Sequence, residues 1–90
     1  MTVNSDGGIV QGYLDRFMQL GAKSQLGEDV QTQLASLVVE ARDHIAIWKS
    51  GDPKENKAKL IARLRLSADL AEQSSHTFAK TLMCAAEMLM

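Results

Sequence analysis

The chain has 90 residues, a formal net charge of −1 and one cysteine, Cys84, which excludes an intrachain disulfide and a molecule-wide field that would attract nucleic acid. Hydrophobic residues make up 46% of the chain and aromatic residues only 4%, so the core must be mainly aliphatic, a composition that favours packed helices over a sheet. Because the N-terminus lacks the features of a secretion signal and no apolar run is long enough to span a membrane, we expect a cytoplasmic protein that does not bind membranes.

The N-terminal part predicts a flexible lead and a short helix. Residues 1–8 form the lead, in which a serine or an aspartate can cap the helix that follows. The helix is indicated by apolar residues spaced for a single face, namely Ile9, Val10, Tyr13, Leu14, Phe17 and Met18. We expect it to end near Gly21. Residues 21–27 contain two glycines and predict a connector with Leu26 packed beneath it.

A second helix is predicted over residues 28–50. Its apolar residues recur in steps of three and four: Val30, Leu34, Leu37, Val38, Ala41, Ile45 and Trp48. The following Gly51-Asp52-Pro53 combines a helix stop with a helix start, because glycine suits the positive φ that closes a helix, aspartate caps the next one, and proline suits its first position. We therefore expect a helical hairpin that turns at these residues.

The chain after Pro53 carries one continuous apolar seam, which consists of Ile61, Leu64, Ala68, Ala71, Ser75, Phe78, Leu82, Ala85 and Leu89. One long helix would satisfy this seam. A break near Ser74-Ser75 is favoured instead, because hydroxyl side chains prefer helix caps to helix interiors and a broken helix gives a compact fold. The sequence thus predicts an all-α antiparallel bundle of three or four helices, formed by residues 9–90 as a single domain.

Several apolar side chains point away from the predicted core. Two leucines of the third helix lie roughly 160° from its seam, a valine lies opposite the core face of the second helix, and the C-terminal stretch is rich in methionine. The residues concerned are Val39, Leu66, Leu70, Met83, Met88 and Leu89. Mutual packing of the helices would hide some of them, but the surplus favours an interface with a second copy or with a partner protein.

No residue pattern predicts catalysis, a metal or a cofactor. Glu40 and His44 lie one helical turn apart and could bind a metal together with His76 or Cys84, but the spacings typical of zinc sites are absent. A hydrogen-bonded pair at the edge of the core is the favoured interpretation. No serine or cysteine is placed beside a histidine and a carboxylate, and no glycine pair follows a strand as in a phosphate loop. We therefore predict that the protein is not an enzyme.

One basic stretch, from Lys54 to Arg65, supports an alternative function. Its cations divide between two sides of the predicted helix, and Lys59 and Arg63 are the candidates for phosphate contacts. A helix-turn-helix over residues 66–82 fits poorly, since a serine replaces the usual turn glycine. The favoured prediction is a small regulatory protein, an inhibitor, anti-activator or adaptor, that buries an apolar helix face against a partner protein and forms a homodimer. A DNA-binding transcriptional regulator is the alternative.

Overall fold

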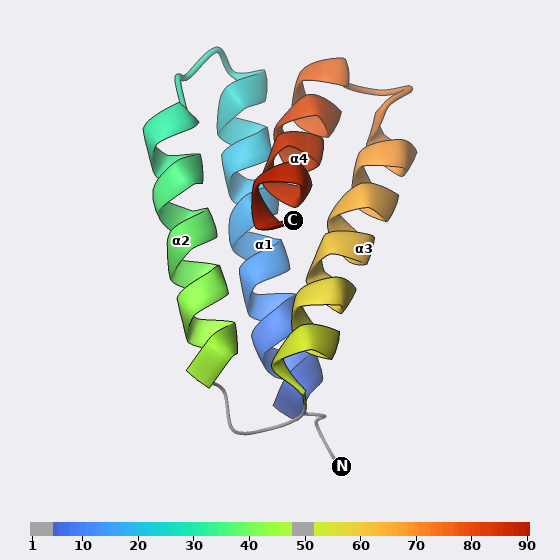
Figure 1. Cartoon of the computed structure of the whole chain (residues 1–90). Helices are drawn as coiled ribbons and strands as arrows, with labels where there is room; N and C mark the ends of the chain where they lie inside the picture. Colours follow the sequence, from blue (N-terminus) through green and yellow to red (C-terminus); the bar gives the residue numbers. More distant parts are fainter. Residues whose placement is uncertain (1–4, 48–51) are drawn as a thin grey trace.

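The computed structural model describes residues 5–47 and 52–90, which form four helices and no strand. These are α1 (Ser5–Gln25), α2 (Gln31–Ile47), α3 (Pro53–Ala71) and α4 (His76–Leu89). Successive helices run antiparallel (Figure 1), and each of the four helices packs against the other three. The predicted all-α antiparallel bundle is confirmed, with four helices rather than three. None of the described helices is sufficiently long and apolar to cross a membrane.

Each helix contributes one buried stripe to a single aliphatic core. The largest fully buried apolar side chains are Val10, Phe17, Ile45, Leu60, Leu64, Leu82 and Leu89. On α3 the innermost residue of the first turns is Leu60, whereas Ile61, which the predicted seam contained, is only half-buried. Because complete burial of one such side chain stabilises a fold by about 1.5–3 kcal/mol, this core accounts for a folded bundle without the outward-facing leucines.

Helix α1 is longer than predicted at both ends. It starts at Ser5, so residues 5–8 are helical rather than part of a flexible lead, and it passes through Gly21 without interruption. Gly21 is buried, and a Cβ atom there would lie 2.9 Å from Cδ2 of Phe78 in α4. The glycine therefore allows close approach of α4 and does not end the helix.

The end of α1 is set by Gly27, which has the positive φ of 92° that favours glycine. Its N–H donates to the carbonyl oxygen of Ser24 at 3.0 Å. The preceding Leu26 is 81% exposed, so the prediction that it packs beneath the connector is wrong. The next helix begins after Asp29, whose Oδ1 accepts a hydrogen bond from the N–H of Gln31 at 3.1 Å.

The start of α3 follows the sequence prediction. Asp52 has extended backbone angles, and its Oδ1 accepts from the N–H of Lys54 at 2.9 Å, with Pro53 as the first helical residue. The predicted helix-closing role of Gly51 and the predicted core position of Trp48 lie outside the described residues.

The break between α3 and α4 is confirmed. Ser75 caps α4, with its Oγ accepting from the N–H of Phe78 at 3.2 Å. Across the break, Nδ1 of His76 lies 2.7 Å from Oε2 of Glu72. The predicted apolar seam has buried residues on both sides of the break: Ala68 on α3, and Leu82 and Ala85 on α4. Helix α4 folds back against α3, so both parts of the seam face the same core.

Candidate functional site

The surface carries several of the apolar side chains that the sequence assigned to an interface. Leu66 and Leu70 on α3 are 59% and 74% exposed, and Val39 on α2 is 46% exposed. Met88 on α4 is exposed as well. These four side chains are available to a binding partner, and removing them from water on binding would be favourable.

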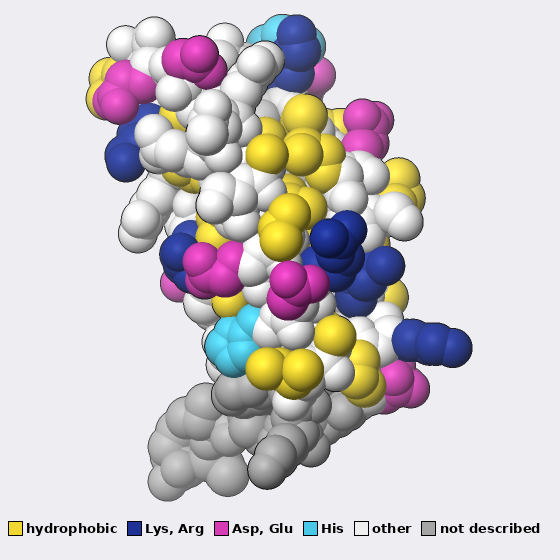
Figure 2. Space-filling view, turned by 60° about the vertical axis from the view of Figure 1, so that its left-hand side comes forward, with side chains coloured by type: hydrophobic (Ala, Val, Ile, Leu, Met, Phe, Trp, Pro, Cys, Tyr) yellow, Lys and Arg dark blue, Asp and Glu magenta, His cyan; other side chains and the backbone are white. Residues whose placement is uncertain are grey.

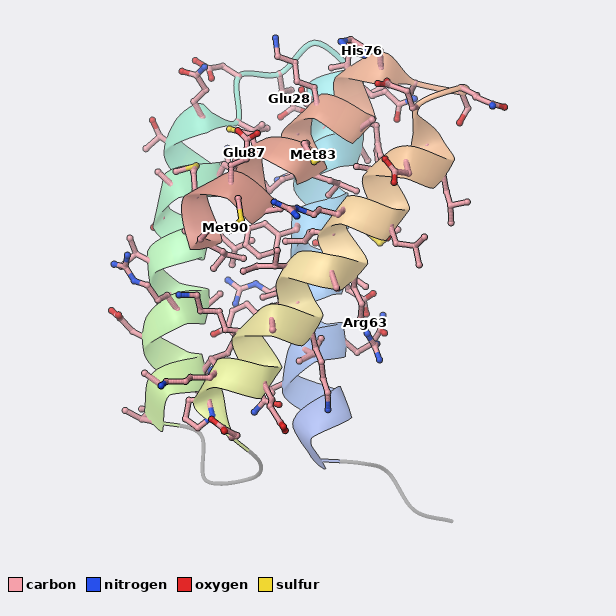
Figure 3. All side chains as sticks on the ribbon, turned by 45° about the vertical axis from the view of Figure 1, so that its right-hand side comes forward. Glu28, Arg63, His76, Met83, Glu87 and Met90 are labelled. Atoms are coloured by element: carbon pink, nitrogen blue, oxygen red, sulfur yellow. The ribbon has the colours of Figure 1, made fainter. Side chains whose placement is uncertain are left out.

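Two of the predicted interface residues lie elsewhere. Met83 is half-buried and packs against the core (Figure 3), where it lines a small hollow between α4 and α3. Leu89 is 1% exposed and belongs to the core, which corrects its assignment to the interface. The core residues of α4 follow the steps Leu82, Ala85 and Leu89, so the neighbouring Met88 points outward instead.

Leu66 and Leu70 form one row with two cations on the outer face of α3. Lys59, Arg63, Leu66 and Leu70 follow one another in steps of four, three and four residues, which places them on one side of a helix. We call this row the α3 stripe. Its cationic half lies towards the start of α3 and its apolar half towards the end. Since the core residues of α3 lie on the opposite side, the α3 stripe faces outward.

The cation Arg63 is placed at the edge that α3 shares with α1 (Figure 3). Its Nη1 donates to Oε1 of Gln11 at 3.3 Å, and Nε2 of Gln11 donates to Oδ1 of Asp15 at 2.8 Å. Arg65 lies on the other side of α3, where its Nη2 is 3.0 Å from Sδ of Met90. The basic residues therefore do not form one strip, and DNA binding stays a prediction that no observation favours.

An exposed isoleucine was missing from the predicted set. Ile47, at the end of α2, is 76% exposed and lies two turns after Val39 along the same outer side of the helix. Figure 2, which brings α2 forward, shows hydrophobic side chains at the surface among charged ones. The sequence held a usable signal, because Ile47 falls outside the spacing of the α2 core residues, Leu34 to Ile45.

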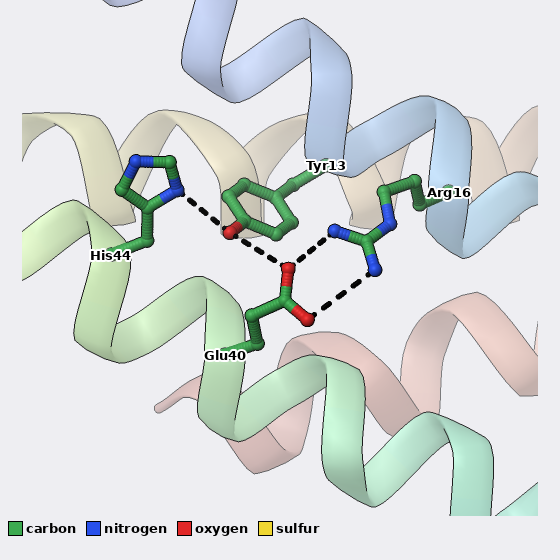
Figure 4. Close-up of polar contacts among 4 residues, drawn as sticks. All are labelled: Tyr13, Arg16, Glu40 and His44. Carbon is green, nitrogen blue, oxygen red and sulfur yellow. Dashed lines mark hydrogen bonds and ion pairs between the residues drawn. The ribbon is translucent and has the colours of Figure 1, made fainter.

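A polar cluster connects α1 to α2 (Figure 4). The hydroxyl oxygen of Tyr13 lies 3.2 Å from Oε2 of Glu40 and 2.8 Å from Nδ1 of His44. Arg16 donates to both carboxylate oxygens of Glu40, with 3.3 Å between Nη2 and Oε1. Because an ionised carboxylate only accepts hydrogen bonds, Tyr13 donates its single hydroxyl proton to Glu40. The bond between Tyr13 and His44 then needs a hydrogen on Nδ1 of His44, which donates it to the hydroxyl oxygen of Tyr13.

The electrostatics of the cluster favour one charge state at neutral pH. Burial raises the pKa of Tyr13, and the nearby carboxylate of Glu40 raises it further. The hydrogen bond from Arg16 lowers the pKa of Glu40. The cluster thus holds an ionised carboxylate, a guanidinium and a neutral phenol. Its hydrogen bonds connect α1 to α2, and its four side chains bond to one another.

The possible metal ligands are not brought together. Glu40 and His44 both contact Tyr13, whereas His76 contacts Glu72, and Sγ of Cys84 lies 4.0 Å from Sδ of Met88. Among the side chains that the structure describes, no group of three or more histidines, cysteines or acids is placed to hold a metal ion.

An open groove of about 530 Å³ lies beside the polar cluster, between α1 and α2. It is lined by Gly8, Ile9 and Gly12 of α1 in addition to the four cluster residues. Nothing lies within 4 Å of a Cβ atom built on either glycine. Arg16 and Glu40 at its rim pair with each other.

Comparisons of the chain with protein-family models, with curated proteins and with solved structures found no match. Function must therefore be inferred from the surface itself. The α3 stripe is its most distinctive feature, because it joins two exposed leucines to two cations on one helix face.

Proposed function

We propose that the chain is a small regulatory protein-interaction module, which binds another protein by burying the α3 stripe against it. The proposal depends on one observation above all: Leu66 and Leu70 lie one turn apart on α3 and are both largely exposed. Two leucines one turn apart form the kind of apolar anchor that helices use when they dock on a hydrophobic groove of a partner.

Folding does not account for these two leucines. The core face of α3 is complete with Leu60, Leu64 and Ala68, which are buried. Leu66 and Leu70 stand on the opposite face, where a polar side chain would serve a monomer equally well. Burying both against a partner would contribute up to about 1.5–3 kcal/mol each, which is a substantial share of a micromolar affinity of about 8 kcal/mol.

The proposed role is binding without catalysis. By covering a helical or hydrophobic surface of its partner in the cytoplasm, the module acts as an inhibitor, an anti-activator or an adaptor, according to what that surface does when free. Lys59 and Arg63 set the orientation of the complex, because charges at the rim of an interface determine register more than affinity.

Site-specific photocrosslinking in the cells that produce the protein tests this function. A photoreactive amino acid replaces Leu70, and in a matched control it replaces Gln19, which is exposed on α1. We expect a discrete adduct with one other protein from position 70 only, and we expect Leu66→Asp to abolish it. The partner identified in this way should bind purified wild-type protein and not the Leu66→Asp variant. Equal crosslinking from both positions, or an adduct that survives Leu66→Asp, would rule out the α3 stripe as the binding surface.

A further inference from the structure

We propose that a second copy of this chain binds the α3 stripe through the outer face of its own α2, so that molecules associate head to tail. The inference rests on the proposed function in one respect, namely that the α3 stripe is a binding surface. It adds the identity of one occupant and the face that this occupant uses.

The outer face of α2 carries the features that complement the α3 stripe. Val39, Asp43 and Ile47 follow one another in steps of four residues, so they form one row, which we call the α2 stripe. Val39 and Ile47 are exposed apolar side chains. The side chain of Asp43 between them is 72% exposed, and the carboxylate of Glu40 stands beside the row.

The two stripes match in charge and in apolar content. The α3 stripe carries two leucines and the guanidinium of Arg63, whose Nη1 also donates to Gln11, whereas the α2 stripe carries a carboxylate between two apolar side chains. If Arg63 is set opposite Asp43, Leu66 lies within one residue of the level of Ile47 when the helices run parallel, and within one residue of the level of Val39 when they run antiparallel. Either direction therefore forms an ion pair and an apolar contact together, and complementary charge of this kind fixes register.

Other charges border the stripes without removing this complementarity. Asp69 lies one turn from Leu66 on α3, and Nε of Arg42 lies 3.9 Å from Oδ1 of Asp43 on α2. Arg42 and Asp43 are both exposed, at a separation where an ion pair in water is weak. Asp43 can thus accept a second cation from another molecule.

The type of contact determines the type of assembly. The α2 stripe and the α3 stripe are different surfaces, so a contact between them is heterologous. In the head-to-tail arrangement that we propose, the two stripes of one molecule bind two different neighbours. Each molecule uses its α3 stripe once and its α2 stripe once, so assemblies grow beyond the dimer, and assembly competes with the binding of another protein to the α3 stripe.

Two variants with one blocked stripe each test this arrangement. The first carries Val39→Ser and Ile47→Ser, the second carries Leu66→Ser and Leu70→Ser, and circular dichroism verifies that both are folded. In sedimentation velocity, we expect the mass of wild-type protein to rise past that of a dimer with concentration. Each variant alone should stay monomeric, because it retains only one of the two stripes that every contact needs. An equimolar mixture should form a dimer and nothing larger.

Each alternative gives a different result. Wild-type protein that stays monomeric at its solubility limit overturns the inference. Self-association of the variant with the blocked α2 stripe reveals a symmetric contact through α3 and also overturns it, as does a mixture that forms no dimer. The photocrosslinking experiment separates this inference from the proposed function. If self-association fails in any of these ways but position 70 still crosslinks to another protein, the proposed function stands. If that crosslink is also absent, the inference and the proposed function both fail.

A charge exchange tests the register. Asp43→Arg and Arg63→Asp should each weaken self-association by about fivefold, since each places like charges in contact. The double variant restores the opposite charges with the signs reversed and should regain most of the wild-type association. A double variant that associates more weakly than either single variant would exclude the pairing of Arg63 with Asp43.

Discussion

Gly21 of α1 and Phe78 of α4 lie so close that a Cβ atom on the glycine would be 2.9 Å from Cδ2 of the aromatic ring. The absence of a side chain at this one position lets α1 and α4 pack together. A methyl group here would force the ring or the helix to move, and overpacking of a core typically costs about 1–3 kcal/mol.

We therefore expect Gly21→Ala to lower the free energy of unfolding by about 1 kcal/mol, since the packing cost outweighs a gain in helix propensity of up to about 1 kcal/mol. Urea denaturation measures the change. Gly12→Ala is the matched control, because nothing lies within 4 Å of its Cβ position and it is also helical. The control should be stabilised by about 0.5–1 kcal/mol. Equal shifts for the two variants would contradict the close approach of α4 to Gly21.

The cap of α4 makes a second prediction. Ser75→Ala removes the acceptor for the N–H of Phe78 and should cost about 0.5–2 kcal/mol of stability. Ser36→Ala, at an exposed position inside α2, should be neutral or slightly stabilising. If thermal unfolding showed Ser75→Ala to be as stable as Ser36→Ala, α3 and α4 would not be separated by this cap.

The polar cluster predicts how the tyrosine titrates. Tyr13 is the only tyrosine of the chain, so absorbance of the ionised phenol reports on it alone. Burial and the carboxylate of Glu40 raise the pKa of Tyr13, and we expect the measured pKa to exceed that of the unfolded protein. Glu40→Gln should lower it partly, because burial remains. A value that equals the unfolded one, or no response to Glu40→Gln, would contradict the contact between the two side chains.

The same cluster predicts a dependence of stability on pH. The pKa of Glu40 is lowered in the folded state by its hydrogen bond from Arg16, so the folded state favours the ionised carboxylate. This stabilisation is complete above the pKa of an unfolded glutamate and disappears as pH falls through the lowered pKa of the folded state. Wild-type protein should therefore be more stable than Glu40→Gln at neutral pH, and the difference should shrink as the solution becomes acidic. A difference that does not change with pH would show that the ion pair is not formed.

The elements of the fold were predictable where local chemistry determines them. Asp52 and Pro53 start α3 as predicted, and Ser75 starts α4, because caps depend on neighbours in sequence. Gly21 was misinterpreted as a stop, since its reason is a ring 57 residues away in the chain. The contacts of Tyr13 with Glu40 and His44 span 27 and 31 residues, and no local pattern specifies which helix faces meet.

Which residues are exposed could be predicted only as accurately as the rotation of each helix about its own axis. Leu66 and Leu70 lie far enough from the core stripe of α3 that an error of one residue does not bury them. Ile61 was assigned to the core in place of Leu60, because adjacent apolar residues fit a helical period almost equally well. The same ambiguity applied at the end of α4, where several apolar residues follow one another and the packing of α4 decides which of them is buried.

The pair Met88 and Leu89 tests that packing directly, because the two residues are adjacent, similar in size and opposite in exposure. Leu89 is in the core, so Leu89→Ala should cost about 2–5 kcal/mol of stability by leaving a cavity. Met88 is exposed, and Met88→Ala should change stability by no more than about 0.5 kcal/mol. Denaturant unfolding of both variants gives the comparison. Larger destabilisation from Met88→Ala would mean that α4 is rotated by about a residue, which would carry Leu89 to the surface and return it to the interface that the sequence predicted.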